Sequence, residues 1–282
     1  RIHHKSADLR HVVQTALERN RKKYDLQSKQ LKGTEKRDKY KVYGELINTY
    51  GYNLEPGSKE LTALNYYTNE EITIPLDPTQ TPGENAQRYF AKYNKQKRTF
   101  EALTELIQET ADDIQYLESI SNALDIALNE ADLAQIKEEL MQSGYIRRKH
   151  TKKKVKLTSK PMHYISSDGY DMYVGKNNLQ NEELTFSFAN GNDWWFHAKG
   201  APGSHVIVKS GGDELPDRTF EEAGRLAAYY SKNRGADKVE IDYIQKKHVK
   251  KPNGAKPGFV VYYTNYSLVI DSDISNIKNV QD

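Results

Sequence analysis

The chain has 282 residues, a formal net charge of +3 and no cysteine. This length suits two domains of ordinary size, and the absence of cysteine excludes a disulfide framework, a thiolate nucleophile and a cysteine metal cluster. No apolar run approaches the ~20 residues of a membrane-spanning helix, and the first residues lack the apolar core of a signal peptide. Because the chain begins in mid-pattern without Met, we expect it to be a fragment of a longer protein.

Residues 1–51 are expected to form the first helix of a coiled coil. Helix-forming residues dominate this stretch, and Tyr43, Leu46 and Ile47 recur at the spacing of one amphipathic stripe. We therefore expect one uninterrupted helix that ends at Gly51.

A second helix is expected over residues 86–144. Its apolar positions alternate steps of three and four, which is the pattern of a coiled-coil seam with two polar interruptions. The seam positions are Phe100, Leu103, Ile107, Thr110, Ile114, Leu117, Ser121, Leu124, Leu128 and Ala131. Gly144 suits the cap at its C-terminal end. The basic first helix and the acidic second one are expected to pair antiparallel, and the coiled coil leaves self-association with a second copy open.

Residues 52–85 form an insert between the two helices. Two short alternating runs, residues 61–67 and 71–76, flank a turn signal at 68–70. This pattern predicts a β-hairpin that caps the coiled coil. Prolines then exclude regular structure until the second helix begins near Glu84.

The sequence changes character in the basic junction, residues 145–160. Residues 101–140 hold eleven Asp and Glu against one Lys, whereas the junction has no acidic residue. A block of one sign predicts a local anion-binding surface rather than a generally basic protein. The candidate RNA contacts of the junction are Arg147, Arg148, Lys152, Lys153 and Lys154.

Residues 161–282 are expected to form a compact α+β domain. Short runs of β-branched and aromatic residues predict strands, and one amphipathic helix is expected over 219–233. The strand-like runs are 162–165, 170–175, 194–198, 205–209, 238–244, 259–263 and 268–271. Residues 181–189 are ambiguous between strand and helix. The predicted fold class is therefore α+β: a long antiparallel helical coiled coil with a small β-hairpin insert, followed by the compact domain.

The densest group of chemistry-bearing side chains lies in residues 193–206. If residues 199–203 form a five-residue hairpin loop, His197 lies directly across from His205. Strand alternation then places Trp195 on an exposed polar face with both histidines, while its neighbours enter the core. An indole can stack on bases while nearby cations meet phosphate. The candidate RNA contacts of this face are Trp195, His197, Lys199, His205 and Lys209.

The residue types of this hairpin also admit other interpretations. The alternative to RNA binding is a purely structural hairpin whose glycines serve the turn. A zinc site is disfavoured because two histidines lack a third ligand at a recognisable spacing. Ser-His-Asp chemistry is disfavoured because Ser204 and His205 are adjacent on a strand and face opposite sides. We therefore expect no catalytic residue, no bound metal and no cofactor.

A second basic run lies in the loop of residues 245–258, which is punctuated by proline and glycine and has no acidic residue. Lysines on a loop can follow a phosphate backbone without reading bases. The alternative is an ordinary solvated connection between strands, but two basic runs in one domain favour polyanion binding. The candidate contacts here are Lys246, Lys247, Lys250, Lys251 and Lys256.

Landmarks of a known family recur along the chain. They are Ser-Ser-Asp-Gly-Tyr at 166–170, Val-Gly-Lys-Asn-Asn at 174–178, the W-F-H and P-G-S-H-V elements within 193–206, Lys-Pro-Gly at 256–258, Asn-Ala-Gln-Arg-Tyr-Phe at 85–90 and Tyr-Asn-Lys at 93–95. Together they resemble the NFACT family, whose members are known as bacterial fibronectin-binding proteins and as ribosome quality-control factors. The similarity covers essentially the whole chain. It implies the C-terminal half of such a protein: the coiled coil with its middle insert, then the RNA-binding domain NFACT-R over 161–282.

The resemblance implies binding to large ribosomal subunits that carry a stalled nascent chain, with rRNA and tRNA as partners. It also implies that the protein acts in the cytoplasm and supports the template-free addition of alanine to the C-terminus of the stalled chain. The ribosome would perform the peptidyl transfer, so this chain is not expected to be an enzyme. Lys176 is a further candidate RNA contact, and it stands where the family motif has arginine. It keeps the charge but loses bidentate phosphate contact. The alternative is a surface-displayed adhesin for fibronectin or fibrinogen, although the sequence has no recognisable anchor.

Overall fold

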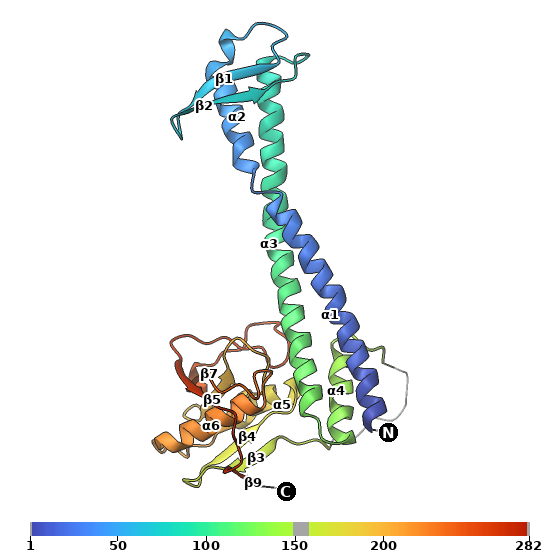
Figure 1. The fold of residues 1–282 in the computed structure, drawn as a ribbon, viewed down its shortest axis with the longest axis vertical. Coiled ribbons are helices and arrows are strands. Elements are labelled where there is room, and N and C mark those ends of the chain that lie inside the picture. The colour runs from blue at the N-terminus through green and yellow to red at the C-terminus, as the bar shows by residue number, and fades with distance from the viewer. Residues whose placement is uncertain (1, 149–157, 281–282) are drawn as a thin grey trace. The chain divides into compact units, whose positions relative to one another are not determined.

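The computed structural model describes residues 2–148 and 158–280. Its contacts divide the chain into two compact units. We call Asn20–Asp112 the hairpin unit, and Arg1–Arg19 with Asp113–Asp282 the sheet unit. Helices α1 (Ile2–Lys32) and α3 (Pro82–Ile126) each contribute residues to both units (Figure 1).

The hairpin unit packs α2 (Arg37–Tyr50) and a β-hairpin against the first turns of α3. Its strands are β1 (Glu60–Asn65) and β2 (Glu70–Pro75), and their register pairs Leu61 with Ile74. The predicted hairpin is therefore confirmed. A short 3₁₀ helix, η1 (Gly51–Asn53), follows α2. The core of this unit consists of Leu46, Ile47, Leu61, Ala63, Ile74, Leu76, Ala86 and Tyr89.

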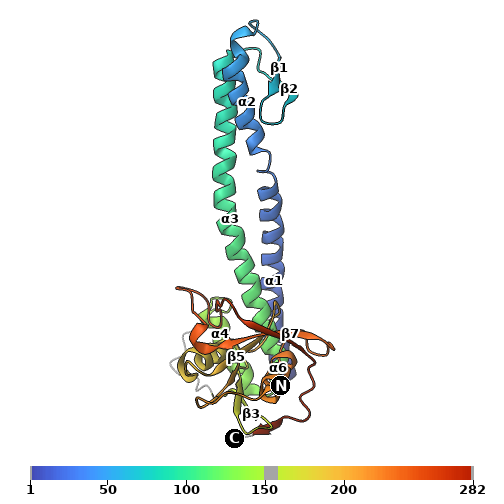
Figure 2. The same ribbon diagram turned by 90° about the vertical axis from the view of Figure 1, so that its left-hand side faces the viewer.

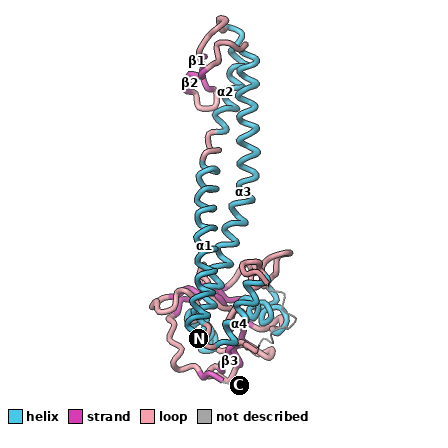
Figure 3. Tube along the Cα trace, turned by 90° about the vertical axis from the view of Figure 1, so that its right-hand side faces the viewer, coloured by secondary structure: helices cyan, strands magenta, loops and turns pink. Residues whose placement is uncertain are grey.

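The first helix is interrupted at residues 33–36, so the prediction of one uninterrupted helix to Gly51 is wrong (Figure 3). The Thr34 hydroxyl donates to the carbonyl of Leu31 at 2.6 Å. A threonine side chain that bonds to nearby backbone competes with helical hydrogen bonds, and Gly33 beside it is a weak helix former. Together they end α1 and allow α2 to begin.

The second helix begins earlier than predicted, at Pro82, because the residues before it cap it. The Glu84 N–H donates to the Thr81 hydroxyl at 3.1 Å, and the Thr81 N–H donates to the Glu84 carboxylate at 3.3 Å. This reciprocal capping box, with proline at the first helical position, satisfies donors at the start of α3.

In the sheet unit, three helices share one core. The first half of α1, the last turns of α3 and α4 (Glu130–Gln142) contribute Leu9, Val13, Leu17, Leu117, Ile120, Leu124, Leu133, Ile136 and Leu140. The predicted seam is therefore buried at Leu117 and Leu124 but not at Leu128, which is 69% exposed. The single helix predicted to 144 breaks before Asn129, whose side chain caps α4. Gly144 follows α4 with a φ of 83°, as its predicted capping role requires.

The compact domain contains a seven-stranded antiparallel sheet in the order β8-β7-β5-β6-β4-β3-β9, which confirms the α+β class. The strands are β3 (Met162–Ile165), β4 (Asp171–Val174), β5 (Trp194–Ala198), β6 (Val206–Val208), β7 (Val239–Gln245), β8 (Tyr266–Ile270) and β9 (Lys278–Val280). The strand predicted over 259–263 is absent from this sheet. Val261 instead forms an isolated bridge with Lys250. Strand β9 was not predicted because three residues carry no readable alternation.

Both faces of the sheet are covered. Helix α6 (Asp217–Tyr229) packs its apolar side on one face. Helix α5 (Asn178–Glu183), a π-helical turn (Leu184–Phe188) and residues 249–262 pack on the other. The ambiguous segment at 181–189 is therefore helical.

Candidate nucleic-acid interface

The β5/β6 hairpin has the register that its loop length predicts. Trp195 pairs with Ile207 and Phe196 with Val206. The same register places His197 opposite His205. Their ring centroids are 5.8 Å apart, and their ring planes are nearly perpendicular. Phe196 enters the main core beneath α6, also as predicted.

Most of the opposite face of this hairpin is covered, so the prediction that it exposes Trp195 and both histidines is wrong, although Lys199 at the loop is exposed. Trp195 is 1% exposed and packs with Ile207 against Leu184, Ile244 and Val249. The segments that cover it come from far along the chain and were not predicted to meet it. The indole therefore does not offer an exposed plate on which a base could stack.

His205 is held on both ring nitrogens. Its Nδ1 lies 2.7 Å from the Thr185 hydroxyl, and its Nε2 lies 3.0 Å from the carbonyl of Gly258. Because a carbonyl can only accept, Nε2 carries the proton and Nδ1 accepts from Thr185. Burial, with a further contribution from nearby His197, lowers the pKa of His205 to about 3. The ring is therefore neutral and serves as a structural link.

His197 stacks on the Trp195 indole with centroids 5.7 Å apart. Burial lowers the pKa of His197, although hydrogen bonds with backbone groups oppose this shift. Neither histidine therefore provides the cation that the predicted phosphate contact requires.

Many of the predicted phosphate-binding cations form ion pairs inside the chain. The pairs are Arg148 with Glu138, Lys176 with Asp132, Lys199 with Glu240, Lys209 with Asp193, Lys251 with Glu182, and Lys256 with Asp113. Exposed pairs such as Lys199–Glu240 are weak and open readily. The Lys176–Asp132 pair differs because its side chains are only 13% and 2% exposed.

Lys176 belongs to a joint between the sheet and α4. Its ammonium group lies 3.0 Å from Asp132, in the first turn of α4. Asn177 and Gln180 both donate to the side chain of Gln135 on the same helix. The Val-Gly-Lys-Asn-Asn motif therefore fastens α4 to the sheet, and its lysine is not placed to receive a phosphate.

The second basic run lies against the loop at 191–193 through the backbone of two of its lysines. Lys246 N donates to Asp193 O at 2.8 Å, Lys247 N donates to Gly191 O at 3.0 Å, and Lys250 Nζ donates to Lys247 O at 3.1 Å. Lys247 and Lys250 are exposed. None of the three forms an ion pair with another residue that the structure describes.

An exposed aromatic ring lies at the start of the same loop. Phe188 is 40% exposed, and the Lys209 ammonium lies 4.7 Å from its ring centroid. The ring also contacts Tyr173 edge-on at 4.8 Å, and Tyr173 stacks on His163 at 4.4 Å. We call the surface of Phe188, Lys209, Lys246, Lys247 and Lys250 the Phe188 patch.

Phe188 was not predicted as a candidate from the sequence. Its alternation with Leu184 and Phe186 in the ambiguous segment at 181–189 was visible, but only the helical turn brings its ring to Lys209. Of the junction residues, Arg147 is exposed. Lys152, Lys153 and Lys154 lie outside the described residues.

Among the described residues, no helix combines the length and the apolar character that crossing a membrane requires. No group of three or more His, Asp or Glu side chains suited to holding a metal ion was found among them.

Comparisons with known proteins identify the family. Residues 1–159 match the sequence model of the NFACT N-terminal and middle domains, and residues 160–263 match that of the NFACT protein RNA binding domain. The chain belongs to the NFACT family. A protein named "Rqc2 homolog RqcH" from Streptococcus pneumoniae serotype 2 (strain D39) is 41% identical over 282 residues, which are 100% of this chain and 51% of that protein.

Two further relatives extend this finding. "Rqc2 homolog RqcH" from Bacillus subtilis (strain 168) is 38% identical over 284 residues, covering 98% of this chain and 49% of that protein. The chain thus spans about half the length of these relatives. A solved structure of the C-terminal part of the fibronectin/fibrinogen-binding protein from Streptococcus suis superposes with a TM-score of 0.76 at 36% identity, covering 99% of both chains.

Proposed function

We propose that this chain is the RNA-binding C-terminal half of a ribosome-associated quality-control factor. The observation that carries this proposal is the Phe188 patch, an exposed ring contacted by Lys209 next to the second basic run, on the domain that matches the family's RNA-binding domain. The name shared by the relatives, "Rqc2 homolog RqcH", supports the quality-control role.

The patch suits single-stranded RNA that is bound without sequence preference. A base can stack on Phe188, because every base has a π-face. Lys246 and Lys247, whose backbone N–H groups bond to the loop at 191–193, and Lys250 beside Lys247 would then contact the adjoining phosphates as point charges. Lys209 is already paired with Asp193 and packs on the Phe188 ring. It would therefore hold the ring in place and would not contact a phosphate.

In the whole protein, this chain would engage large ribosomal subunits that carry a stalled nascent chain, contact rRNA and tRNA in the cytoplasm, and support alanine tailing. We infer that it contributes binding and no catalysis of its own. The engagement of both His205 nitrogens by Thr185 and Gly258 supports this inference, because neither nitrogen is left to accept a substrate proton.

The test is RNA affinity measured against salt for the chain and three variants. Phe188→Ala should weaken the free energy of RNA binding by about 1–3 kcal/mol, which is the usual contribution of one base stacked on an aromatic ring. Replacing Lys246, Lys247 and Lys250 by Gln should reduce the slope of log K against log salt by about 2, at ~0.7 for each phosphate contact. Trp195→Phe should leave RNA affinity unchanged.

The matched control replaces three exposed lysines elsewhere, Lys137, Lys238 and Lys278, by Gln. It removes the same three positive charges. An equal loss of RNA affinity in this control would show that RNA is attracted by the net charge of the chain and not by the Phe188 patch. Unchanged binding by the Phe188→Ala and triple-lysine variants would refute the Phe188 patch. A large loss in Trp195→Phe would instead restore the indole as the stacking plate.

A second candidate function is adhesion to fibronectin or fibrinogen, which the name of the similar Streptococcus suis protein favours. Titration of soluble fibronectin against the chain in physiological salt tests it. Specific adhesion predicts saturable binding that persists when salt is modestly raised. Binding that disappears would be screened attraction to basic residues and would remove this candidate.

A further inference from the structure

Strand β8 forms one margin of the seven-stranded sheet, beside β7 (Figure 2). An edge strand presents unpaired backbone groups to solvent and can accept a further strand. β8 also lies outside residues 160–263, the part of the chain that matches the RNA-binding domain. Its outer edge is therefore a separate candidate for an interaction surface.

The hydrogen bonds of β7 show which backbone groups of β8 face outward. The carbonyl of Glu240 accepts from the Lys199 N–H at 2.9 Å, so Glu240 directs its backbone toward β5. Glu240 pairs with Val269, and the members of an antiparallel pair point either toward each other or away from each other. Val269 therefore directs its N–H and C=O outward. The same holds for Ser267, and among the described residues no loop or helix backbone bonds to either residue.

The edge lacks the side chains that commonly block strand addition. Residues 259–270 contain no charged residue, no proline and no glycine, in a chain that is 29% charged. Lysine and proline are the residues that usually prevent an edge strand from accepting another. Ser267 and Val269 are both exposed, Val269 at 59%. The edge is thus open in its side chains as well as in its backbone.

The α6 face of this edge ends in a group of aromatic rings. The Tyr266 ring lies 5.5 Å from that of Tyr243 and 6.0 Å from that of Trp194. Trp194 meets Phe220 of α6 edge-on at 4.9 Å. Tyr266 is 58% exposed, whereas the other three rings are half-buried. An added strand places one side chain beside Tyr266 on this face and another beside Val269 on the opposite face, so apolar side chains suit both.

The charge of this edge favours an uncharged peptide over RNA. RNA binding depends on cations that contact phosphates, and residues 259–270 supply none. Two acids, Asp271 and Asp273, follow the strand directly, and Asp271 pairs with Arg225. Burial of a charged side chain without a partner is costly, so an uncharged segment fits this edge best.

A second copy of the chain is a poorer fit than a free peptide. β8 has five residues, so its edge is about 17 Å long at ~3.3 Å per residue and about 10 Å thick. Two copies paired through it would cover on the order of 170 Å² each, well below the ~800 Å² per partner of a stable interface. A free peptide can fold its alternate side chains over both faces of the edge, which is how strand-adding peptides are recognised.

We propose that the outer edge of β8 binds an extended, uncharged peptide segment of a partner protein as an additional strand. The N–H and C=O groups of Ser267 and Val269 form the backbone hydrogen bonds. β-Branched or aromatic residues at alternate positions of the peptide pack beside Tyr266 on one face and beside Val269 on the other. The proposal goes beyond RNA binding, since it uses none of the residues of the Phe188 patch.

The test selects random short peptides, displayed on phage, on the immobilised full chain. Val269→Pro serves for counter-selection, because it removes the outward N–H and leaves the hydrogen bonds between β8 and β7 in place. Selected peptides should be uncharged, with β-branched or aromatic residues at alternate positions. A synthetic copy should bind Val269→Pro about tenfold more weakly than the unmodified chain, because one hydrogen bond is lost. Val269→Thr, which keeps the backbone and the branched shape, should bind it equally.

Methylation of the peptide nitrogens gives a second measurement that leaves the protein unaltered, should Val269→Pro disturb β8. Methylation of the alternate nitrogens that face β8 should abolish binding, and methylation of the other set should not, because only one set donates to an adjoining strand. Equal effects of the two methylation patterns would overturn the proposal. Selection that yields no peptide able to distinguish the chain from Val269→Pro would also overturn it.

Two further measurements separate the alternative occupants of this edge. Displacement of the peptide by an RNA oligonucleotide would assign the edge to RNA. A dimer in sedimentation experiments that Val269→Lys abolishes would assign it to a second copy, and either result would overturn the proposal. Val269→Pro should keep the RNA affinity of the unmodified chain, so the peptide edge and the Phe188 patch can fail independently.

Discussion

The carboxylate of Glu139 accepts two hydrogen bonds from Asn178, one from its backbone N–H at 3.2 Å and one from its Nδ2 at 3.0 Å. The Tyr116 hydroxyl donates to the same carboxylate at 2.5 Å. Glu139 is only 1% exposed. The last turns of α4 and α3 are thus fastened to the first residue of α5 by one buried acid.

This acid should make stability depend on pH. Burial raises the pKa of Glu139, although the hydrogen bonds from Tyr116 and Asn178 oppose the shift. Above the usual glutamate range the folded state then binds more protons than the unfolded state, so the free energy of unfolding falls as pH rises. Urea unfolding of the chain and of Glu139→Gln across this range should show the slope only in the unmodified chain. A slope shared by both would show that other groups cause it.

Gly175 should tolerate no side chain. A Cβ at this position would lie 1.9 Å from the Asn181 Oδ1, the atom that accepts a hydrogen bond from His205 N at 3.1 Å. Gly175→Ala should therefore displace a buried amide and cost about 2–4 kcal/mol of unfolding free energy. Gly191→Ala is the control, since its Cβ would meet Lys247 at 3.5 Å in ordinary contact. Equal thermal shifts for both substitutions would contradict the steric argument.

His205 should stay neutral well below the usual range for histidine. Its folded pKa is lowered to about 3 from an ordinary 6.5, so the unfolded state binds more protons between these values. The free energy of unfolding should then decrease as pH falls through 6.5. Nitrogen NMR should show a neutral ring protonated at Nε2 from pH 7 to 5, with His205→Gln used to assign the signals. Titration of this ring near 6.5 would refute its burial.

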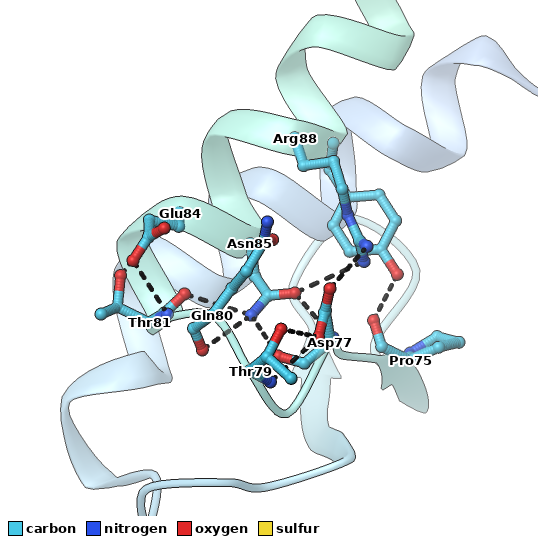
Figure 4. Close-up of polar contacts among 9 residues, drawn as sticks. Pro75, Asp77, Thr79, Gln80, Thr81, Glu84, Asn85 and Arg88 are labelled. Atoms are coloured by element: carbon cyan, nitrogen blue, oxygen red, sulfur yellow. Dashed lines mark hydrogen bonds and ion pairs between the residues drawn. The ribbon is translucent and has the colours of Figure 1, made fainter.

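The loop before α3 should depend on one amide side chain (Figure 4). Asn85 accepts from Asp77 N at 2.8 Å and donates to the carbonyls of Asp77, Gln80 and Thr81. Asn85→Ala leaves these groups without their partner. It should lower the free energy of unfolding by about 2–4 kcal/mol, since several buried hydrogen bonds are lost together. Thr81→Ala, which removes only the cap, should cost about 1 kcal/mol.

Thermal unfolding and hydrogen exchange at residues 77–81 measure both effects. Thr99→Ala, an exposed site on the same helix, serves as the control and should change stability little. If exchange in this loop is unchanged in Asn85→Ala, its order comes from the strands instead.

How far the sequence predicts this structure depends on the range of the interactions involved. The hairpin at 60–75 and the register of β5 with β6 were predictable, because turn length and alternation act over a few residues. The helix breaks at 33–36 and 127–129 were missed, since the apolar spacing continues through them. The Thr34 side chain competes with helical hydrogen bonds at the end of α1, and the Asn129 side chain caps the start of α4.

The candidate site shows the same division. Its lysine-rich loop and the family were evident from residue types alone. Which rings and cations reach solvent was not, because Trp195 is covered by the π-helical turn and by residues 249–262. Phe188 became a candidate only through its contact with Lys209.

By itself, the sequence determined the place of the β-hairpin insert, the register of β5 with β6 and the family of this protein, since turn chemistry, alternation and motifs are local. Only the tertiary structure decided which charges are available to a ligand. Lys256 is neutralised by Asp113, which lies 143 residues away in the chain, and Lys176 is buried with Asp132. Whether two charged side chains pair depends on the distance between them in the folded chain, and the packing of the helices and the sheet sets that distance.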